Sequence, residues 1–174
     1  MQYIALLRGI NVGGNHKVDM KALKSQLASY GFADISTYIN TGNIILESEK
    51  SLTETEKVIK ECLEKHYDFP IPLLLKTAEE MKNIAEAIPK DWQNDTTHKT
   101  DVAYLFREAD SSDIIDKLPV KKEFLDMRYT PGAIFWRVER ENYNKSQLNK
   151  LASHSSYRIM TIRNVNTARK LAEL

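Results

Sequence analysis

The sequence is poor in cysteine, and this limits the chemistry that it can support. Cys62 is the only cysteine among 174 residues. A single thiol excludes an intrachain disulfide and a cluster of thiolate metal ligands, which is typical of proteins from a reducing compartment. Cys62 shares one expected helix face with Val58, Ile59 and Leu63, so a packed core thiol is favoured over a nucleophile.

An excess of charge of one sign is also lacking. The chain has 25 Lys and Arg residues against 24 Asp and Glu residues, which gives a formal net charge of +1. Proteins that grip a phosphate backbone through charge alone have a larger positive excess. The chain contains no apolar run of membrane-spanning length, and Met1 is followed by no basic leader. We therefore expect a cytoplasmic protein with no membrane partner.

Motifs for metal binding and covalent catalysis are absent as well. The histidines His16, His66, His98 and His154 show no metal-ligand spacing, and no G-x-S-x-G or Cys-His motif occurs. We expect no metal site. The sequence identifies no cofactor, no reaction and no oligomeric state, and it leaves open whether the protein is an enzyme.

The first half of the chain has the hydrophobic pattern of a small α+β unit. Strands are expected at residues 3–7, 35–38, 44–46 and 73–75, with helices that carry residues 20–30 and 58–63 between them. Asp19 is expected to cap the first helix, and Thr53 with Glu56 to form a capping box on the second. The order β-α-β-β-α-β predicts a ferredoxin-like unit, in which two helices cover one face of a four-stranded antiparallel sheet.

The second half repeats this order. Strands are expected at residues 102–106, 124–127, 133–138 and 157–161, with helices near 112–118 and 145–151 and at the C-terminus. The segment NTGNIIL of the first half aligns in role with YTPGAIFW of the second. We predict an α+β fold of duplicated ferredoxin-like units with antiparallel sheets. The first would span residues 1–76, a connecting helix and linker 77–100, and the second unit with a C-terminal helix 101–174.

A loop rich in glycine and asparagine follows the first expected strand. It reads Arg8-Gly9-Ile10-Asn11-Val12-Gly13-Gly14-Asn15. Backbone N–H groups in such a loop can approach an anion closely. The loop is not a P-loop, because Asn15 and His16 stand where Lys and Ser or Thr should follow, and it lacks the G-x-G-x-x-G dinucleotide fingerprint.

The hairpin between the second and third strands should lie beside this loop, because the first and third strands of the predicted sheet are neighbours. The candidate ligand-binding residues of the two segments are Arg8, Gly9, Asn11, Gly13, Gly14, Asn15, Asn40, Thr41 and Asn43. In one interpretation Arg8 contacts a small phosphorylated or carboxylated ligand, and the amide side chains and Thr41 orient it. In the other, turn formation explains the Gly and Asn residues, and Arg8 pairs with a carboxylate.

A second polar cluster, Arg163, Asn164 and Asn166, precedes the last expected helix. These residues are candidates for the same ligand if the two halves bring them to the first loop. Asn and Thr are ordinary residues at the start of a helix, so capping by Asn164 or Asn166 is the favoured explanation.

The alternative function is a nucleic-acid or protein interaction module without a catalytic site. Its sheet face would use aromatic residues such as Tyr129, Phe135 and Trp136, and its basic residues would be Lys121, Lys122, Arg128 and Arg137. Alternate residues of a strand point to opposite faces, so Phe135 and Trp136 cannot line one surface, and a buried aromatic is favoured.

Three segments, LLRGINVGGN, TYINTGNIIL and TIRNVNT, carry a resemblance to a known family. With them the chain resembles the bacterial domain of unknown function 1697 family over essentially its whole length. The resemblance implies a cytoplasmic protein with a duplicated α+β fold, and it implies no reaction. This chain has Val165 where the family commonly has Trp, and Asn40-Thr41 where the family often has Gln-Ser. If the tryptophan contacts a ligand in relatives, the resemblance implies a different ligand here.

Overall fold

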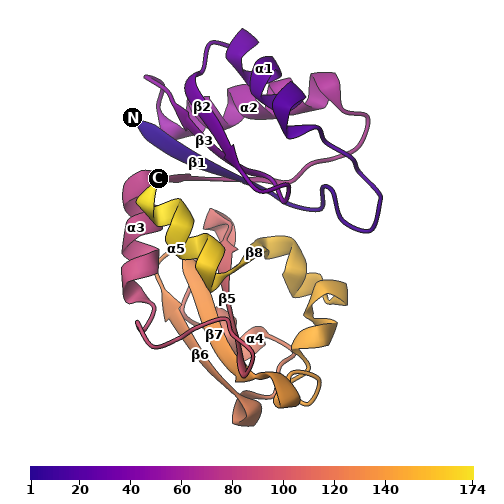
Figure 1. Cartoon of the computed structure of the whole chain (residues 1–174), viewed down its shortest axis with the longest axis vertical. Helices are drawn as coiled ribbons and strands as arrows, with labels where there is room; N and C mark the ends of the chain where they lie inside the picture. Colours follow the sequence, from indigo (N-terminus) through magenta and orange to yellow (C-terminus); the bar gives the residue numbers. More distant parts are fainter. The chain divides into compact units, whose positions relative to one another are not determined.

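The computed structural model describes residues 1–174 and divides into two compact units (Figure 1). The first unit comprises Met1–Glu79 with Leu174, and the second comprises Glu80–Glu173. Each contains a four-stranded antiparallel sheet, ordered β2-β3-β1-β4 in the first unit and β6-β7-β5-β8 in the second. Because the two orders correspond strand by strand, the predicted duplicated α+β fold is confirmed.

The first unit follows the predicted order of elements. These are β1 (Gln2–Leu7), α1 (Met20–Ser29), β2 (Ala33–Tyr38), β3 (Asn43–Glu47), α2 (Leu52–His66) and β4 (Leu73–Thr77). Asp19 caps α1 as predicted, because its side chain accepts hydrogen bonds from two backbone amides of the first turn. The capping box of α2 was predicted at the wrong residue: Ser51 and Glu54 form it, one half-turn before Thr53. Two overlapping Ser/Thr-x-x-Glu motifs occur here, and the earlier one gives the longer helix.

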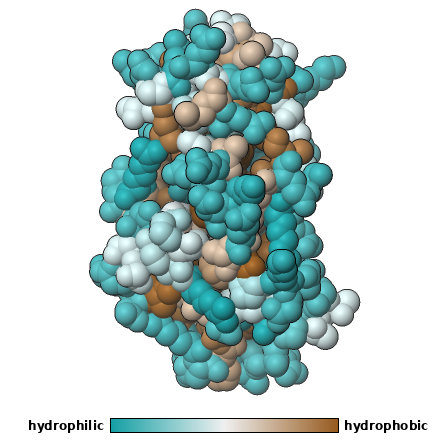
Figure 2. Space-filling model, turned by 90° about the vertical axis from the view of Figure 1, so that its left-hand side faces the viewer, coloured by the Kyte–Doolittle hydropathy of each residue, from teal (hydrophilic) through white to brown (hydrophobic).

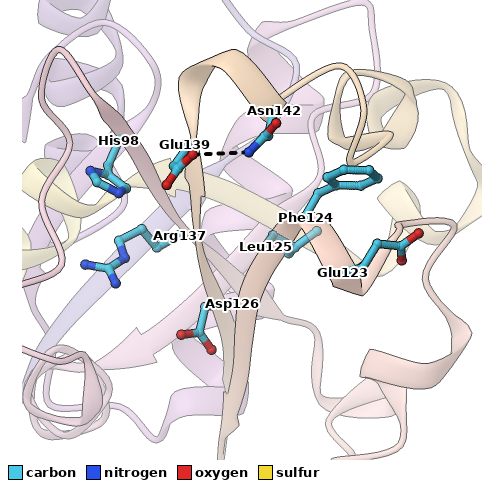
Figure 3. A pocket seen from close by; sticks show the side chains of 8 residues that line it. All are labelled: His98, Glu123, Phe124, Leu125, Asp126, Arg137, Glu139 and Asn142. Carbon is cyan, nitrogen blue, oxygen red and sulfur yellow. Dashed lines mark hydrogen bonds between the residues drawn. The ribbon is translucent and has the colours of Figure 1, made fainter.

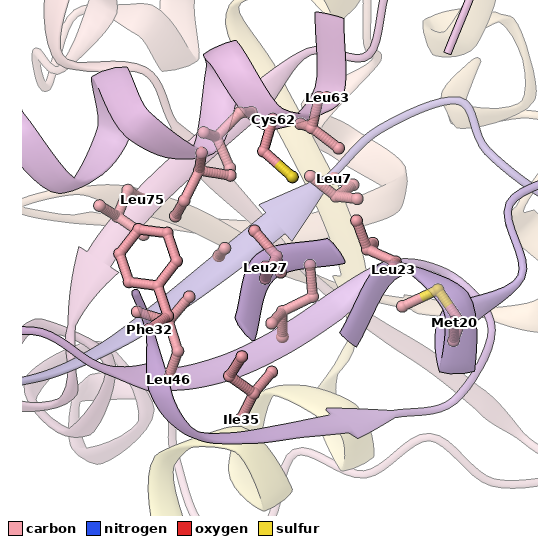
Figure 4. Packing of buried hydrophobic residues seen from close by; sticks show 14 of the residues in the cluster. Leu7, Met20, Leu23, Leu27, Phe32, Ile35, Leu46, Cys62, Leu63 and Leu75 are labelled. Carbon is pink, nitrogen blue, oxygen red and sulfur yellow. The ribbon is translucent and has the colours of Figure 1, made fainter. Parts of the chain in front are cut away.

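The core of the first unit lies between the sheet and the helices α1 and α2. Tyr3, Ala5 and Leu7 alternate along β1 and face this core. Figure 4 shows Cys62 and Leu63 of α2 and Leu23 and Leu27 of α1 converging on it. Burial raises the pKa of the Cys62 thiol, which keeps it protonated, so the prediction of a packed core thiol is confirmed.

The second unit begins within α3 (Ala78–Ala87), and its connection from β7 to β8 differs from the predicted one. Its strands and further α-helices are β5 (His98–Leu105), α4 (Ile114–Lys117), β6 (Leu125–Thr130), β7 (Ala133–Glu139), β8 (Met160–Asn164) and α5 (Val165–Glu173). The helix predicted near residues 145–151 is wrong, because two 3-10 helices, η4 (Leu148–Ser153) and η5 (Ser155–Ile159), replace it. Gln147 has a positive φ of 68°, which prevents a continuous α-helix.

Trp92 anchors the polar stretch of residues 90–100 to the second unit. Its side chain is 2% exposed, and its ring meets the ring of Phe135 edge-on at 5.8 Å. The guanidinium groups of Arg128 and Arg137 lie over the same indole, 4.8 and 5.3 Å from the ring centroid. The stretch that was expected to be a linker therefore contributes a large side chain to the folded unit.

The aromatic residues of β7 are buried on opposite faces of the sheet. Trp136 packs in the core with Leu105 and Ile134, whereas Phe135 packs against Trp92. Both side chains are 2% exposed. The prediction of a buried aromatic is confirmed, and these two rings leave no stacking platform for bases. No helix of the protein has the length and hydropathy needed to cross a membrane.

Asp95 organises the turn that leads into β5, and this predicts a pH dependence. Its carboxylate accepts hydrogen bonds from the amides of His98 and Thr97 and from the Thr97 hydroxyl, at 2.8 to 2.9 Å. These bonds lower the pKa of Asp95 to about 2. Because the unfolded-state pKa is about 3.9, the stabilisation is complete above roughly pH 4 and is lost as the pH falls toward 2.

We therefore expect the free energy of unfolding to fall more steeply between about pH 4 and pH 2 in the wild type than in Asp95→Asn. Urea denaturation at closely spaced pH values measures both curves. Parallel curves for the two proteins would show that the turn does not hold the carboxylate in its ionised form.

Candidate functional site

The loop after β1 and the hairpin turn between β2 and β3 meet at one end of the first sheet. β1 and β3 are antiparallel neighbours, with Leu6 opposite Asn43. Just beyond this pair, the amide of Leu7 donates a 2.8 Å hydrogen bond to the carbonyl of Gly42. We call these segments the first loop (residues 8–18) and the hairpin turn (residues 39–42). Their predicted convergence is confirmed within the first unit.

Asn11 ties the first loop together and fastens it to the hairpin turn. Its Nδ2 donates hydrogen bonds to the carbonyls of Val18, at 3.0 Å, and Asn40, at 2.8 Å. Its Oδ1 accepts a hydrogen bond of 2.8 Å from the amide of Val18. The side-chain amide of this predicted ligand residue is therefore occupied in holding the two segments against each other.

Asn43 has a similar structural role in the hairpin. It is completely buried, and its Nδ2 donates to the carbonyl of Tyr38 at 2.9 Å and to the hydroxyl of Thr41 at 3.1 Å. For Asn11 and Asn43, turn formation thus accounts for the residue without any ligand.

The importance of Asn11 can be measured with a matched pair of variants. Asn11→Gly keeps the backbone free to adopt the positive φ of 56° but removes three hydrogen bonds. We expect a loss of roughly 2–3 kcal/mol, at about 1 kcal/mol for each bond. Asn15→Gly, at the exposed tip of the same loop, is the control and should cost about 0.5 kcal/mol or less beyond the entropy of glycine. Equal losses of stability for the two variants in urea denaturation would contradict the structural role assigned to Asn11.

The tip of the first loop is a tight turn that presents backbone amides to solvent. The amide of Asn15 donates a 3.2 Å hydrogen bond to the carbonyl of Val12, and the intervening Gly13 and Gly14 have positive φ angles of 62° and 77°. The amides of these glycines take no part in the hydrogen bonds inside the loop. Asn15 is exposed, as are Asn40 and Thr41 of the hairpin turn.

Arg8 and His16 lie near the base of the first loop. The amide of Arg8 donates to the carbonyl of Pro72 at 3.1 Å, which fixes the start of the loop beside β4, and its side chain is half-buried. The His16 ring stacks on Phe69 at 4.5 Å, and its Nδ1 lies 3.2 Å from the carbonyl oxygen of Gly9. Sequence reasoning missed this second anchor of the loop, because Phe69 is distant in sequence and no local pattern pairs it with His16.

The remaining predicted site residues belong to the second unit. Arg163 is buried in β8, and its Nη1 donates to the Thr161 hydroxyl at 3.0 Å and to the Ile162 carbonyl at 2.9 Å. Burial lowers the pKa of Arg163 to about 10, although the phenols of Tyr104 and Tyr157 partly oppose this shift. Arg163 therefore stays charged at neutral pH.

The two asparagines beside Arg163 differ in their surroundings. The Oδ1 of Asn164 accepts a 2.9 Å hydrogen bond from the amide of Thr167, so Asn164 is the one of the two predicted candidates that caps α5. Asn166 is exposed in the first turn of α5.

Two hollows lie away from these residues. In the second unit, a cavity of about 330 Å³ has a polar lining (Figure 3), formed by His98, Glu123, Phe124, Leu125, Asp126, Arg137, Glu139 and Asn142. Glu139 accepts a hydrogen bond from Asn142 there, at 3.2 Å. In the first unit, a hollow of about 470 Å³ lies between α1 and β2. Neither hollow is lined by a predicted site residue, and no cluster of His, Cys, Asp and Glu could hold a metal ion.

Three of the four basic residues that would form a nucleic-acid surface have acidic partners. Lys122 pairs with Asp116, Arg128 lies 3.9 Å from Asp126, and Arg137 lies 3.7 Å from Asp91. The side of the molecule seen in Figure 2 is mostly hydrophilic, with hydrophobic residues scattered among the polar ones. These pairs reduce the positive potential that binding to a phosphate backbone requires.

Comparison with known proteins identifies relatives but no reaction. None of the curated proteins matches the chain. Among solved structures, the conserved bacterial protein SP0830 from Streptococcus pneumoniae is similar, with 29% sequence identity and a TM-score of 0.84. The match covers 99% of this chain and 97% of that one, so both units and their order are shared. The model of a family described as a protein of unknown function, DUF1697, matches residues 1–136, and the chain belongs to this family.

Proposed function

We propose that this protein binds a small phosphorylated or carboxylated ligand where the first loop meets the hairpin turn. The observation that supports this most is the exposed turn at Gly13 and Gly14, whose amides lie outside the loop's own hydrogen bonds. Backbone amides at such a turn favour anions. The turn is held in place by Asn11 and by the stacked ring of His16, so little conformational entropy is lost on binding.

The residues of the proposed site have different roles in binding. Arg8 supplies the positive charge and a planar set of donors that suits a carboxylate or phosphate group. The amides of Gly13 and Gly14 and the exposed side chains of Asn15, Asn40 and Thr41 would orient the ligand, while Asn11 and Asn43 maintain the shape. We further propose a cytoplasmic location, with which the single buried thiol of Cys62 is compatible.

Thermal denaturation against a panel of nucleotides, sugar phosphates and carboxylate metabolites tests this function. A ligand at about a hundred times its Kd should stabilise the folded protein by roughly 2.7 kcal/mol, which is visible as a shift in Tm. Arg8→Ala should abolish the shift, and Arg8→Lys should retain part of it because the charge remains without the planar fork.

Lys17→Ala is the matched control, because Lys17 is an exposed cation of the same loop. It should keep the full shift. The proposal would be refuted if no compound raised the Tm of the wild type, or if Arg8→Ala and Lys17→Ala kept equal shifts.

A further inference from the structure

Tyr104 of β5 carries a polar atom that the fold of the chain leaves unused. Its side chain is completely buried, and its hydroxyl has no hydrogen-bond partner. A buried hydroxyl without a partner destabilises the folded state, so such groups are rare and each one needs an explanation. By contrast, the buried Tyr3 of the first unit donates its hydroxyl to the carbonyl of Lys50 at 2.9 Å.

Two polar residues of β8, Thr161 and Arg163, lie on the same part of the sheet as Tyr104. In the register of β5 with β8, Tyr104 lies opposite Thr161, and Val102 lies opposite Arg163. Because side chains alternate along a strand, Tyr104, Thr161 and Arg163 share one face of the sheet. Burial raises the pKa of the Tyr104 phenol, and the positive charge of the Arg163 guanidinium partly opposes this shift.

The groups on this face offer hydrogen bonds and positive charge. The Thr161 hydroxyl accepts from Arg163, so its own proton can be donated elsewhere, and Tyr104 adds a second hydroxyl proton. This combination of donors around a cation is complementary to an oxyanion.

Comparison of the duplicated halves shows that the fold does not require these hydroxyls. The bond from the Leu7 amide to the Gly42 carbonyl has its equivalent in the bond from Leu105 to Gly132, at 2.8 and 2.9 Å. In this correspondence, two leucines, Leu6 and Leu74, occupy the positions of Tyr104 and Thr161. The first unit therefore fills the same positions with apolar side chains, and the polar pair is specific to the second unit.

We propose that Tyr104, Thr161 and Arg163 form a second anion site, within the second unit, that receives one phosphate or carboxylate group. The hydroxyl of Tyr104 donates to an oxygen of this group, and Arg163 balances its charge. This inference goes beyond the first-loop site and is tested separately from it.

Tyr104→Phe tests this proposal, and its expected effect on stability without anion is unusual for a substitution of a buried residue. Without added anion, this variant should be as stable as the wild type or more stable, because it removes a buried hydroxyl that has no partner. With inorganic phosphate or acetate, titrated to saturation at constant ionic strength, the wild type should gain Tm and the variant should lose most of that gain. Measuring both proteins in an Arg8→Ala background removes the first-loop site from the comparison.

Tyr3→Phe is the matched control, since it removes a buried hydroxyl that has a partner. It should lower the Tm without anion and keep the anion-dependent gain. A gain with phosphate alone assigns the site to phosphate groups, and a gain with acetate alone assigns it to carboxylates. The proposal is overturned if chloride gives the same gain in Tm, or if no gain occurs in the Arg8→Ala background. It is also overturned if Tyr104→Phe keeps the gain, or if this variant loses as much stability without anion as Tyr3→Phe does.

Discussion

Gly42→Ala should destabilise the first unit by roughly 2–5 kcal/mol. Gly42 has a φ of +90°, and a Cβ atom at this position would lie 2.7 Å from Cβ of Leu7 and 2.9 Å from Cδ1 of Ile10. The positive φ costs an L-residue about 1–2 kcal/mol, and overpacking adds about 1–3 kcal/mol. The nearest obstacle is a Cβ attached to the β1 backbone, and the Leu7 amide bonds to the Gly42 carbonyl, so the strand cannot move away cheaply.

Gly31→Ala is a well-matched control for this prediction. Gly31 has the same φ of +90°, but nothing lies within 4 Å of an added Cβ. It should therefore show only the conformational cost of about 1–2 kcal/mol. Urea denaturation followed by circular dichroism gives both values, and hydrogen exchange of the β1 and β3 amides locates the effect in the first unit. Equal losses for the two variants would show that the hairpin turn is not packed against the first loop as described.

Trp92→Ala should destabilise the second unit by about 3–5 kcal/mol, the usual range for truncation of a buried tryptophan. The indole is buried against Phe135, and it also carries the guanidinium groups of Arg128 and Arg137 on its ring. Truncation would leave a cavity and remove these cation–π contacts. The loss is larger than expected for a residue in a linker, where substitutions usually change stability by about 0.5 kcal/mol or less.

Trp92→Phe keeps a ring at this position and should restore much of the lost stability. Both variants can be followed by urea denaturation, with hydrogen exchange in β5 and β7 as the local readout. A loss below about 1 kcal/mol for Trp92→Ala would contradict the anchoring of residues 90–100 to the second unit, because so small a loss of stability is typical of substitutions at exposed positions.

The sequence was sufficient to predict strand order and the meeting of two loops, because both follow from hydrophobic periodicity. The short apolar run of residues 3–7 predicted a buried strand, and the β-α-β-β-α-β order then made β1 and β3 neighbours. Local capping chemistry was predicted correctly at Asp19, and Asn164 proved to be the cap of the two candidates named for α5, whereas the α2 cap was predicted two residues too late.

Features that depend on contacts between distant residues were not predictable. The burial of Trp92 depends on Phe135, and the stacking of His16 depends on Phe69. The replacement of a helix by η4 and η5 depends on the backbone at Gln147, whose positive φ has no local sequence signal. Likewise, the sequence showed that Asn11 and Asn15 both lie in the first loop, but only the structure shows that Asn11 holds the loop to Asn40.

The proposed anion site at the first loop is tested most directly by an NMR titration of the ¹⁵N-labelled protein with the compound that gives the largest thermal shift. The account predicts saturable chemical-shift changes at the amides of Gly13, Gly14 and Asn15, and their loss in Arg8→Ala but not in Lys17→Ala. Saturable binding that leaves these three amides unchanged would contradict the assignment of the first loop as the site.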